Sequence, residues 1–224
     1  TTQPPPDLAA VSQVSAEDFV KKLVDSLRMR GLVLGPDAAL GRNRQGNFNF
    51  LRQLGADMGF WVESVEPLLL DGAAVKSRNI REGISRGEVA ACAKLLDRNY
   101  CLEGQVIIGD RRGTELGFPT ANLSLDSEFV LPGDGIYATW AFIDGVRYPS
   151  ATSIGMRPTF GLSKRLLEVH VMDFDQNIYG EPMCVEFVSK LRDQETFQSV
   201  KELVHQINRD VADSRQVLTQ DRGD

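Results

Sequence analysis

Cysteine and histidine are scarce in this sequence of 224 residues, which contains three cysteines and two histidines. The cysteines, Cys92, Cys101 and Cys184, are odd in number and widely spaced, which argues against a disulfide framework and against a zinc knuckle. The first residues, "TTQPPPDLAAVS", also lack the basic start and apolar core of a signal peptide. We therefore expect a cytoplasmic protein in a reducing compartment.

Long apolar runs and an excess of basic residues are absent as well. No run approaches the roughly 20 residues that a membrane-spanning helix needs, so we expect no membrane partner. The formal net charge is −6 at pH 7, which argues against a general nucleic-acid binder, although a local basic loop can still hold a small phosphate ligand. The hydrophobic content of 42% is enough for one large or two small cores.

The first part of the chain alternates helical and strand patterns. The segment "SAEDFVKKLVDSLRMRG" predicts a helix that begins at the N-cap Ser15 and stops at Gly31, and "LVLG" and "WVESVEPLLL" predict strands. This alternation is typical of an α/β layer with a parallel sheet. Two strands cannot form a stable doubly wound sheet, and the chain begins with threonine, so we expect further strands upstream or support from a neighbour.

The pattern changes near residue 99, where five β-rich runs begin, punctuated by Gly, Pro and Asp. Their spacing favours a small antiparallel barrel with one open mouth for a ligand. The closing segment, residues 195–218, places apolar residues on one helical face, and we expect this helix to pack on the barrel.

The stretch "IIGDRRGTELGFPTANL" contains candidate phosphate-binding residues. Gly109, Gly113 and Gly117 let the backbone turn sharply and approach a ligand, while Arg111 and Arg112 can neutralise phosphate oxygens. An ordinary hairpin or barrel turn explains the same glycines and arginines, so both readings stay open at this point.

Thr120 and Asn122 favour the first reading. Alternation in an extended segment points both side chains to the same side, and Pro119 restrains the backbone before them. Two neutral oxygens that converge in this way can coordinate Mg²⁺, which needs one or two protein ligands beside nucleotide phosphates. The alternative is that both side chains hydrogen-bond to backbone groups.

Five motifs in order resemble the riboflavin kinase module of the bacterial bifunctional riboflavin kinase/FAD synthetase family. They are "GDRRGTELGFPTANL", "LPGDGIYATW", "SIGMRPTF", "LLEVHVMDFDQNIYG" and "FVSKLRDQETFQSVKELVHQINRDVADSR". The resemblance implies a six-stranded Greek-key barrel with a C-terminal helix. It also implies transfer of the γ-phosphate of ATP to the 5′-hydroxyl of riboflavin, which gives FMN and ADP.

The resemblance assigns roles to individual residues. Thr120 and Asn122 match the positions that bind Mg²⁺ and the ATP phosphates, and Glu168 matches the catalytic base, although a lone strand glutamate is usually only solvent-facing. We read the neighbouring His170 as supporting structure. The remaining candidates for binding ATP are Gly109, Arg112, Gly113, Asp173 and Tyr179, and those for the flavin are Arg192 and Glu195.

Structural readings exist for several of these candidates. Tyr179 can instead pack against the barrel, and Arg192 and Glu195 can instead be solvent-exposed charges before the last helix. A non-catalytic flavin- or nucleotide-binding barrel is therefore an alternative to the kinase. Glu168 discriminates between the two alternatives, because a kinase needs a base and a binding module does not.

Residues 1–98 resemble the second half of the FAD synthetase (adenylyltransferase) module of the same family, and residues 99–224 form the kinase module. The His-x-Gly-His nucleotide motif of the adenylyltransferase is absent, since the two histidines are His170 and His205. A second motif of the adenylyltransferase is normally of the type Ser-Ser-Thr-x-Ile-Arg. Here residues 76–81 read Lys-Ser-Arg-Asn-Ile-Arg, so Arg78 stands at the threonine position. We expect no FAD synthesis by this chain alone. The alternative is that a full-length parent protein synthesises FAD. We also expect self-association through the incomplete region.

Overall fold

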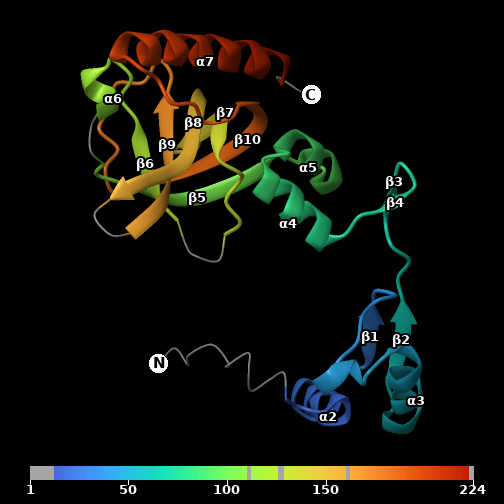
Figure 1. Ribbon diagram of the computed structural model, residues 1–224. Helices are drawn as coiled ribbons and strands as arrows, with labels where there is room; N and C mark the ends of the chain where they lie inside the picture. Colours follow the sequence, from blue (N-terminus) through green and yellow to red (C-terminus); the bar gives the residue numbers. More distant parts are fainter. Residues whose placement is uncertain (1–12, 110–111, 126–128, 160–161, 222–224) are drawn as a thin grey trace. The chain divides into compact units, whose positions relative to one another are not determined.

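The computed structural model describes residues 13–109, 112–125, 129–159 and 162–221. The chain divides into two compact units, Thr1–Ala74 and Val75–Asp224. Figure 1 shows the helices and strands of each unit. The overall class is α+β, as the sequence predicted, with a small α/β unit followed by a β-barrel unit.

Helix α2 (Ala16–Leu27) of the first unit begins where the sequence predicted but ends earlier. The Ser15 side chain accepts a hydrogen bond from the Asp18 backbone N–H at 3.0 Å, which caps the helix. Arg28 closes the helix in a left-handed conformation with φ 52°. Gly31 is therefore not the stop signal. It opens β1 (Gly31–Leu34), where a Cβ atom would lie 2.1 Å from Cε2 of Trp61.

Strands β1 and β2 (Trp61–Ser64) pair in parallel, with α3 (Phe48–Met58) between them in the chain, so the predicted α/β layer is confirmed. Its small core is formed by Val20, Leu34, Leu51 and Phe60. Three further elements complete the unit: η1 (Arg42–Arg44), β3 (Leu69–Leu70) and β4 (Ala73–Ala74).

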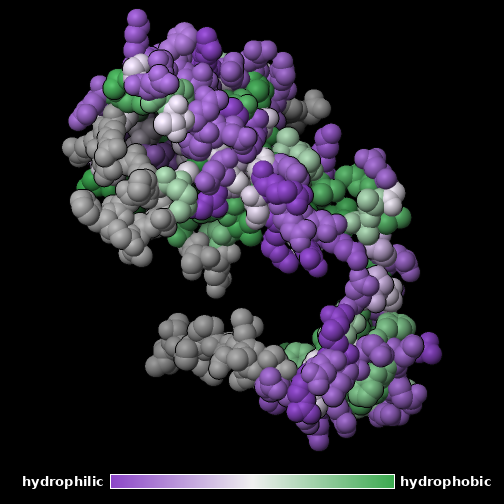
Figure 2. Space-filling model, in the orientation of Figure 1, coloured by the Kyte–Doolittle hydropathy of each residue, from purple (hydrophilic) through white to green (hydrophobic). Residues whose placement is uncertain are grey.

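This two-stranded sheet leaves large apolar side chains exposed. Val33 is 53% exposed and Trp61 is 55% exposed, although parallel sheets are normally covered on both faces. Leu68 and Leu69, beside the β3–β4 hairpin, are also exposed. Hydrophobic residues are visible on the surface of this unit in Figure 2. Self-association through this region stays a prediction.

Helices α4 (Ser77–Arg86) and α5 (Val89–Leu96) belong to the barrel unit. Ile84, Val89 and Cys92 are buried in the same core as the inward-facing barrel residues. The boundary of compact packing therefore lies between Ala74 and Val75. The module boundary expected at 98/99 concerns sequence similarity and stays a prediction.

The second unit contains a closed six-stranded antiparallel barrel with strand order β10-β5-β6-β9-β8-β7, which confirms the predicted barrel. The sixth strand comes from the "PTANL" stretch, which forms the short β6 next to β5 and β9. The strands are β5 (Tyr100–Ile107), β6 (Ala121–Ser124), β7 (Gly135–Ile143), β8 (Val146–Thr159), β9 (Leu162–Val171) and β10 (Pro182–Arg192).

Alternation along the strands separates the interior of the barrel from its exterior. Tyr137, Ile154, Val169 and Phe187 are fully buried in the interior core. The Tyr137 hydroxyl donates a hydrogen bond to the Gly133 carbonyl. Burial raises the pKa of Tyr137 to about 12, so the phenol keeps its proton and remains a donor at neutral pH.

Helix α7 (Val200–Gln220) lies across the outside of the barrel, as Figure 1 shows. It packs against β7, β8 and β10, which confirms the predicted docking of this helix. Ala138, Trp140 and Leu218 form the buried contact between helix and sheet. Among the described helices, none is long and apolar enough to cross a membrane.

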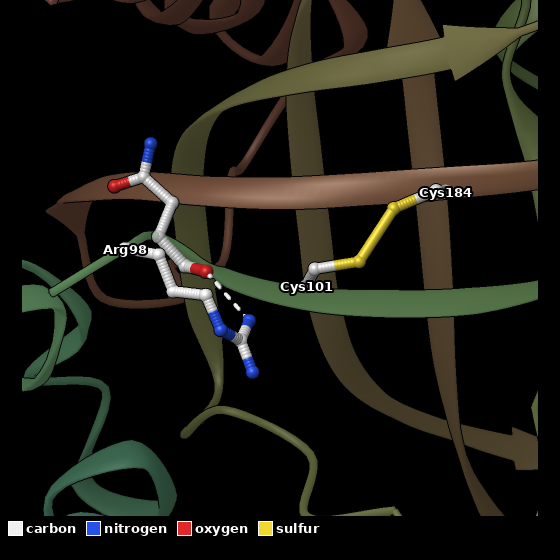
Figure 3. Close-up of a disulfide and its surroundings, with 4 residues drawn as sticks. Arg98, Cys101 and Cys184 are labelled. Carbon is white, nitrogen blue, oxygen red and sulfur yellow. Dashed lines mark hydrogen bonds between the residues drawn. A yellow bond between two sulfur atoms is a disulfide. The ribbon is translucent and has the colours of Figure 1, made fainter. Parts of the chain in front are cut away.

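Two of the three cysteines form a disulfide, contrary to our expectation. Cys101 on β5 and Cys184 on β10 are joined across the strand pair, with a Cα–Cα distance of 6.6 Å (Figure 3). The spacing of the cysteines in the sequence did not reveal this disulfide, because the partners are 83 residues apart. The pairing of β5 with β10 brings them together. Cys92 is free and buried.

An ion pair between Arg192 on β10 and Asp210 on α7 ties the helix to the barrel. Arg192 Nε donates to Asp210 Oδ1 at 2.8 Å and Nη2 donates to Oδ2 at 2.6 Å, a bidentate geometry. The two side chains are only 16% and 6% exposed. Removing one partner would leave the other charge poorly solvated.

We expect Asp210→Ala to lower the free energy of unfolding by about 3 kcal/mol, because Arg192 loses its buried counter-charge. Urea unfolding followed by circular dichroism measures this change. Glu82→Ala serves as the matched control, since Glu82 pairs with Arg78 on the exposed face of α4 and should have no measurable effect. Equal stability of both variants would contradict the structural role of the Arg192–Asp210 pair.

Candidate functional site

Two cavities meet at Thr120, just before β6. The smaller, of about 290 Å³, is lined by Thr120 and by the connection between β9 and β10. The larger, of about 910 Å³, lies on the outer face of the barrel next to α7 and the segment before it. Thr120 lines both cavities, so its side chain and backbone stand where two ligands would come together.

The larger cavity has a polar wall and an apolar wall. Glu168 and His170 of β9 line it from the barrel side, because both point outward while Val169 points into the core. The apolar wall comes from α7 and the segment before it, and consists of Phe197, Val200, Leu203, Ile207 and Val211. A planar apolar ring with polar substituents would suit such a site.

Asn122 and Glu168 are brought together by the pairing of β6 with β9. They are directly opposite one another in the antiparallel register, and such cross-strand neighbours have Cβ atoms about 5 Å apart. Asn122 is only 7% exposed. A Cβ atom on Gly109 would lie 2.2 Å from Nδ2 of Asn122, so the glycine leaves the space that this side chain fills.

Gly113 likewise leaves space that the chain around Thr120 fills. It lies in the short helix α6 (Arg112–Glu115), and its carbonyl accepts a hydrogen bond from Phe118 N–H at 2.8 Å. A Cβ atom on Gly113 would lie 2.3 Å from the Phe118 carbonyl oxygen and 3.4 Å from Thr120 Oγ1. Gly109 and Gly113 therefore pack against the predicted clamp, whereas a Cβ atom on Gly117 would meet nothing within 4 Å. Arg111, and the side chain of Arg112, lie outside the part of the chain that the structure describes.

The smaller cavity is formed mainly by the β9–β10 connection. Tyr179 lines it, and its backbone N–H donates to Asn177 Oδ1 at 3.1 Å, which fixes this segment locally. Asp173 is not among the residues that line this cavity. Its carboxylate accepts hydrogen bonds from Arg215 of α7, at 2.8 Å to each oxygen. Its predicted contact with ATP stays a prediction.

Arg192 and Glu195 both line the larger cavity, on the side of α7. The guanidinium of Arg192 is already bound to Asp210, and this hydrogen-bonded partner raises the pKa of Arg192 above its usual value. Arg192 Nη1 also donates to the Asp193 carbonyl at 2.9 Å. The pair is thus a fixed part of the wall, and the predicted flavin contacts of Arg192 and Glu195 stay predictions.

Gln194 is a lining residue that the sequence did not single out. Its amide donates hydrogen bonds at 3.0 Å to Ser153 Oγ and to the Ile154 carbonyl, which attaches the segment before α7 to β8. A Cβ atom on Gly155 would lie 2.9 Å from the same amide nitrogen. No local sequence pattern reports this contact, because its partners come from distant strands.

The oxygen groups here suit one kind of metal ion. Among the described residues, no group of three or more His, Cys, Asp or Glu side chains could hold a metal by itself. Thr120 and Asn122 offer neutral oxygens, the type of ligand that Mg²⁺ accepts when phosphate oxygens and water complete its shell. The donor set therefore fits a magnesium–nucleotide complex, and it does not fit a zinc site.

Curated proteins of similar sequence are bifunctional riboflavin kinase/FMN adenylyltransferases. The Pseudomonas fluorescens protein is 38% identical over 90% of this chain, and the Haemophilus influenzae protein is 37% identical over 88%. The Escherichia coli K12 protein is 33% identical over 91%. The chain spans 64 to 65% of the length of these relatives.

A solved structure has the same fold over most of the chain. It is the crystal structure of a protein named Macrolide-efflux Protein, from Streptococcus pneumoniae. The TM-score is 0.82 at 29% sequence identity, and the match covers 92% of this chain and 67% of the other.

Family models match both parts of the chain. The model described as FAD synthetase matches residues 9–79, and the one described as Riboflavin kinase matches residues 96–218. The second match contains the barrel, both cavities and α7 except its last two residues. The chain therefore belongs to the riboflavin kinase family.

Proposed function

We propose that this chain is an ATP:riboflavin 5′-phosphotransferase that produces FMN and ADP. The observation that carries the proposal is the pairing of Asn122 on β6 with Glu168 on β9, next to Thr120, which lines both cavities, although Asn122 itself lines neither. Phosphoryl transfer is helped by groups that hold the phosphates of ATP and, close to them, a group that accepts the proton of the attacking hydroxyl. In the proposed site, β6 and the residue before it carry the clamp, and the neighbouring β9 carries the acceptor.

The two cavities suggest how the substrates divide. We assign ATP to the smaller cavity, which contains Tyr179, and riboflavin to the larger one, which contains Glu168 and the apolar face of α7. Thr120 then lies between the γ-phosphate and the ribityl chain. This arrangement brings the reacting groups together and fixes their orientation, which is a large part of catalysis in phosphoryl transfer.

In the proposed reaction the 5′-oxygen of riboflavin forms a bond to the γ-phosphorus, and the bond from that phosphorus to the β–γ bridging oxygen breaks. The hydroxyl proton passes to the carboxylate of Glu168, and ADP leaves. Thr120 and Asn122 would hold Mg²⁺ through their neutral oxygens. The ion would neutralise negative charge on the phosphate oxygens.

We do not assign adenylyl transfer to this chain, although the relatives are named for both activities. The sequence contains no His-x-Gly-His motif, because its two histidines are His170 and His205. Mass analysis of the products formed from riboflavin, ATP and Mg²⁺ tests the whole proposal. FMN with ADP supports it, bound flavin without product favours a binding barrel, and FAD with pyrophosphate would require a second site.

We expect Glu168→Gln to lower kcat by roughly 100-fold or more while the dissociation constant for ATP stays nearly unchanged, because the amide cannot accept the proton. Steady-state kinetics and nucleotide titration measure the two effects. Glu103→Gln is the matched control, since Glu103 is an exposed residue of β5 that lines neither cavity. Undiminished turnover of Glu168→Gln would exclude Glu168 as the base.

We expect Gly109→Ala to weaken binding of Mg²⁺–ATP by about 10-fold or more, because the new methyl group displaces the Asn122 amide. The fold should survive, since the contacted atoms are the end of a side chain rather than backbone. Isothermal titration of Mg²⁺–ADP and a thermal melt separate the two effects. Gly35→Ala is the control, as a Cβ atom there meets nothing within 4 Å. Unchanged nucleotide binding by Gly109→Ala would contradict the role of Asn122.

A further inference from the structure

His170 lies beside the clamp but is not part of it. It follows Glu168 by two residues on β9 and therefore points to the same outer face of the barrel, where it lines the larger cavity. Its cross-strand neighbour on β8 is Ala151, a small residue that leaves room for the ring. The ring Nδ1 lies 2.9 Å from the carbonyl oxygen of Pro119.

This contact identifies a ring nitrogen that carries a hydrogen. A backbone carbonyl can only accept a hydrogen bond, so Nδ1 of His170 must carry the hydrogen and donate it. In the neutral ring Nε2 is then the acceptor, and in the charged ring both nitrogens donate. The bond to Pro119 is therefore compatible with either protonation state.

The ring is held in place from a second side. Phe118 packs edge-on against it, with ring centroids 5.6 Å apart and an interplanar angle of 75°. This geometry is a favoured one for aromatic pairs. The His170 ring is thus held by two neighbouring residues, since it packs against Phe118 and donates a hydrogen bond to Pro119.

The Pro119 carbonyl belongs to the peptide group that leads directly into Thr120. This peptide is planar and trans, so the Thr120 N–H points away from His170 when the carbonyl points toward it. Proline already restricts φ at position 119, and the hydrogen bond from His170 restricts the remaining rotation about ψ. The two constraints together fix the backbone from which the Thr120 side chain extends.

We propose that His170 is a positioning residue, which sets the orientation of Thr120 through its hydrogen bond to the Pro119 carbonyl. The inference rests on the proposed function, because Thr120 is assigned there to the Mg²⁺–ATP complex. His170 itself does not transfer the proton or bind the metal. Its loss should weaken binding of Mg²⁺–ATP and leave riboflavin binding intact.

A set of three variants tests which nitrogen of the ring is needed. His170→Asn places an amide nitrogen near the position of Nδ1 and can donate to Pro119, whereas His170→Gln places its amide near the position of Nε2. His170→Ala removes both groups. Riboflavin affinity by fluorescence quenching, KM for Mg²⁺–ATP and kcat, and a thermal melt are measured for each variant.

We expect His170→Ala and His170→Gln to raise KM for Mg²⁺–ATP by about 5- to 10-fold, with the dissociation constant of riboflavin unchanged. His170→Asn should restore KM to within about 2-fold of the parent chain. A parallel loss of both affinities in all three variants would indicate a general packing role. Recovery by glutamine and not by asparagine would indicate a direct contact of Nε2 with substrate. Either result overturns the inference.

The failure of this inference can be distinguished from failure of the proposed function. If the parent chain makes no FMN, the kinase assignment is wrong, and His170 is then judged by calorimetric binding of Mg²⁺–ADP to the same variants. Weakened binding by His170→Ala with recovery by His170→Asn still supports positioning. A parent chain that does not bind Mg²⁺–ADP, or variants that bind it equally well, overturns the inference too.

Discussion

The antiparallel register of β6 with β9 is the constraint on which the site depends. It sets Ala121 opposite Val169 inside the barrel and Asn122 opposite Glu168 outside it. Side chains alternate along a strand, so a slip of one residue would turn Glu168 into the core and Val169 toward the larger cavity. The apolar packing that closes the barrel therefore also aims the polar groups. Core and site cannot be varied independently at these positions.

The local parts of this arrangement could be predicted from the sequence, and the long-range parts could not. Alternating apolar residues indicated the strands of the barrel, and the apolar face of α7 indicated its docking. By contrast, Arg192 has the sequence context of a solvated charge, yet its partner Asp210 lies within the following helix. Cys101 and Cys184 are likewise joined only by the pairing of two distant strands. Local patterns carry no information about such partners.

The loop glycines show that the physical reason for a glycine can differ from the one that the sequence suggests. We expected Gly109, Gly113 and Gly117 to let the backbone turn sharply and approach a ligand. Gly117 does have a positive φ of 85°, but Gly109 and Gly113 lie outside the left-handed region. Those two are small because a side chain there would collide with Asn122 or with the Phe118 carbonyl. Sequence identifies the glycine, whereas only the folded chain identifies what occupies the space.

The charge balance of the two cavities explains why neutral oxygens suit the proposed clamp. Among the described residues that line the cavities, the permanently cationic side chain is Arg192, and its guanidinium is bound by Asp210. In the proposed site, a divalent cation would add positive charge beside the phosphates of ATP. A carboxylate ligand would cancel part of that charge. Thr120 and Asn122 would hold the cation without cancelling its charge, and the proposed proton acceptor Glu168 would not have to serve as a metal ligand.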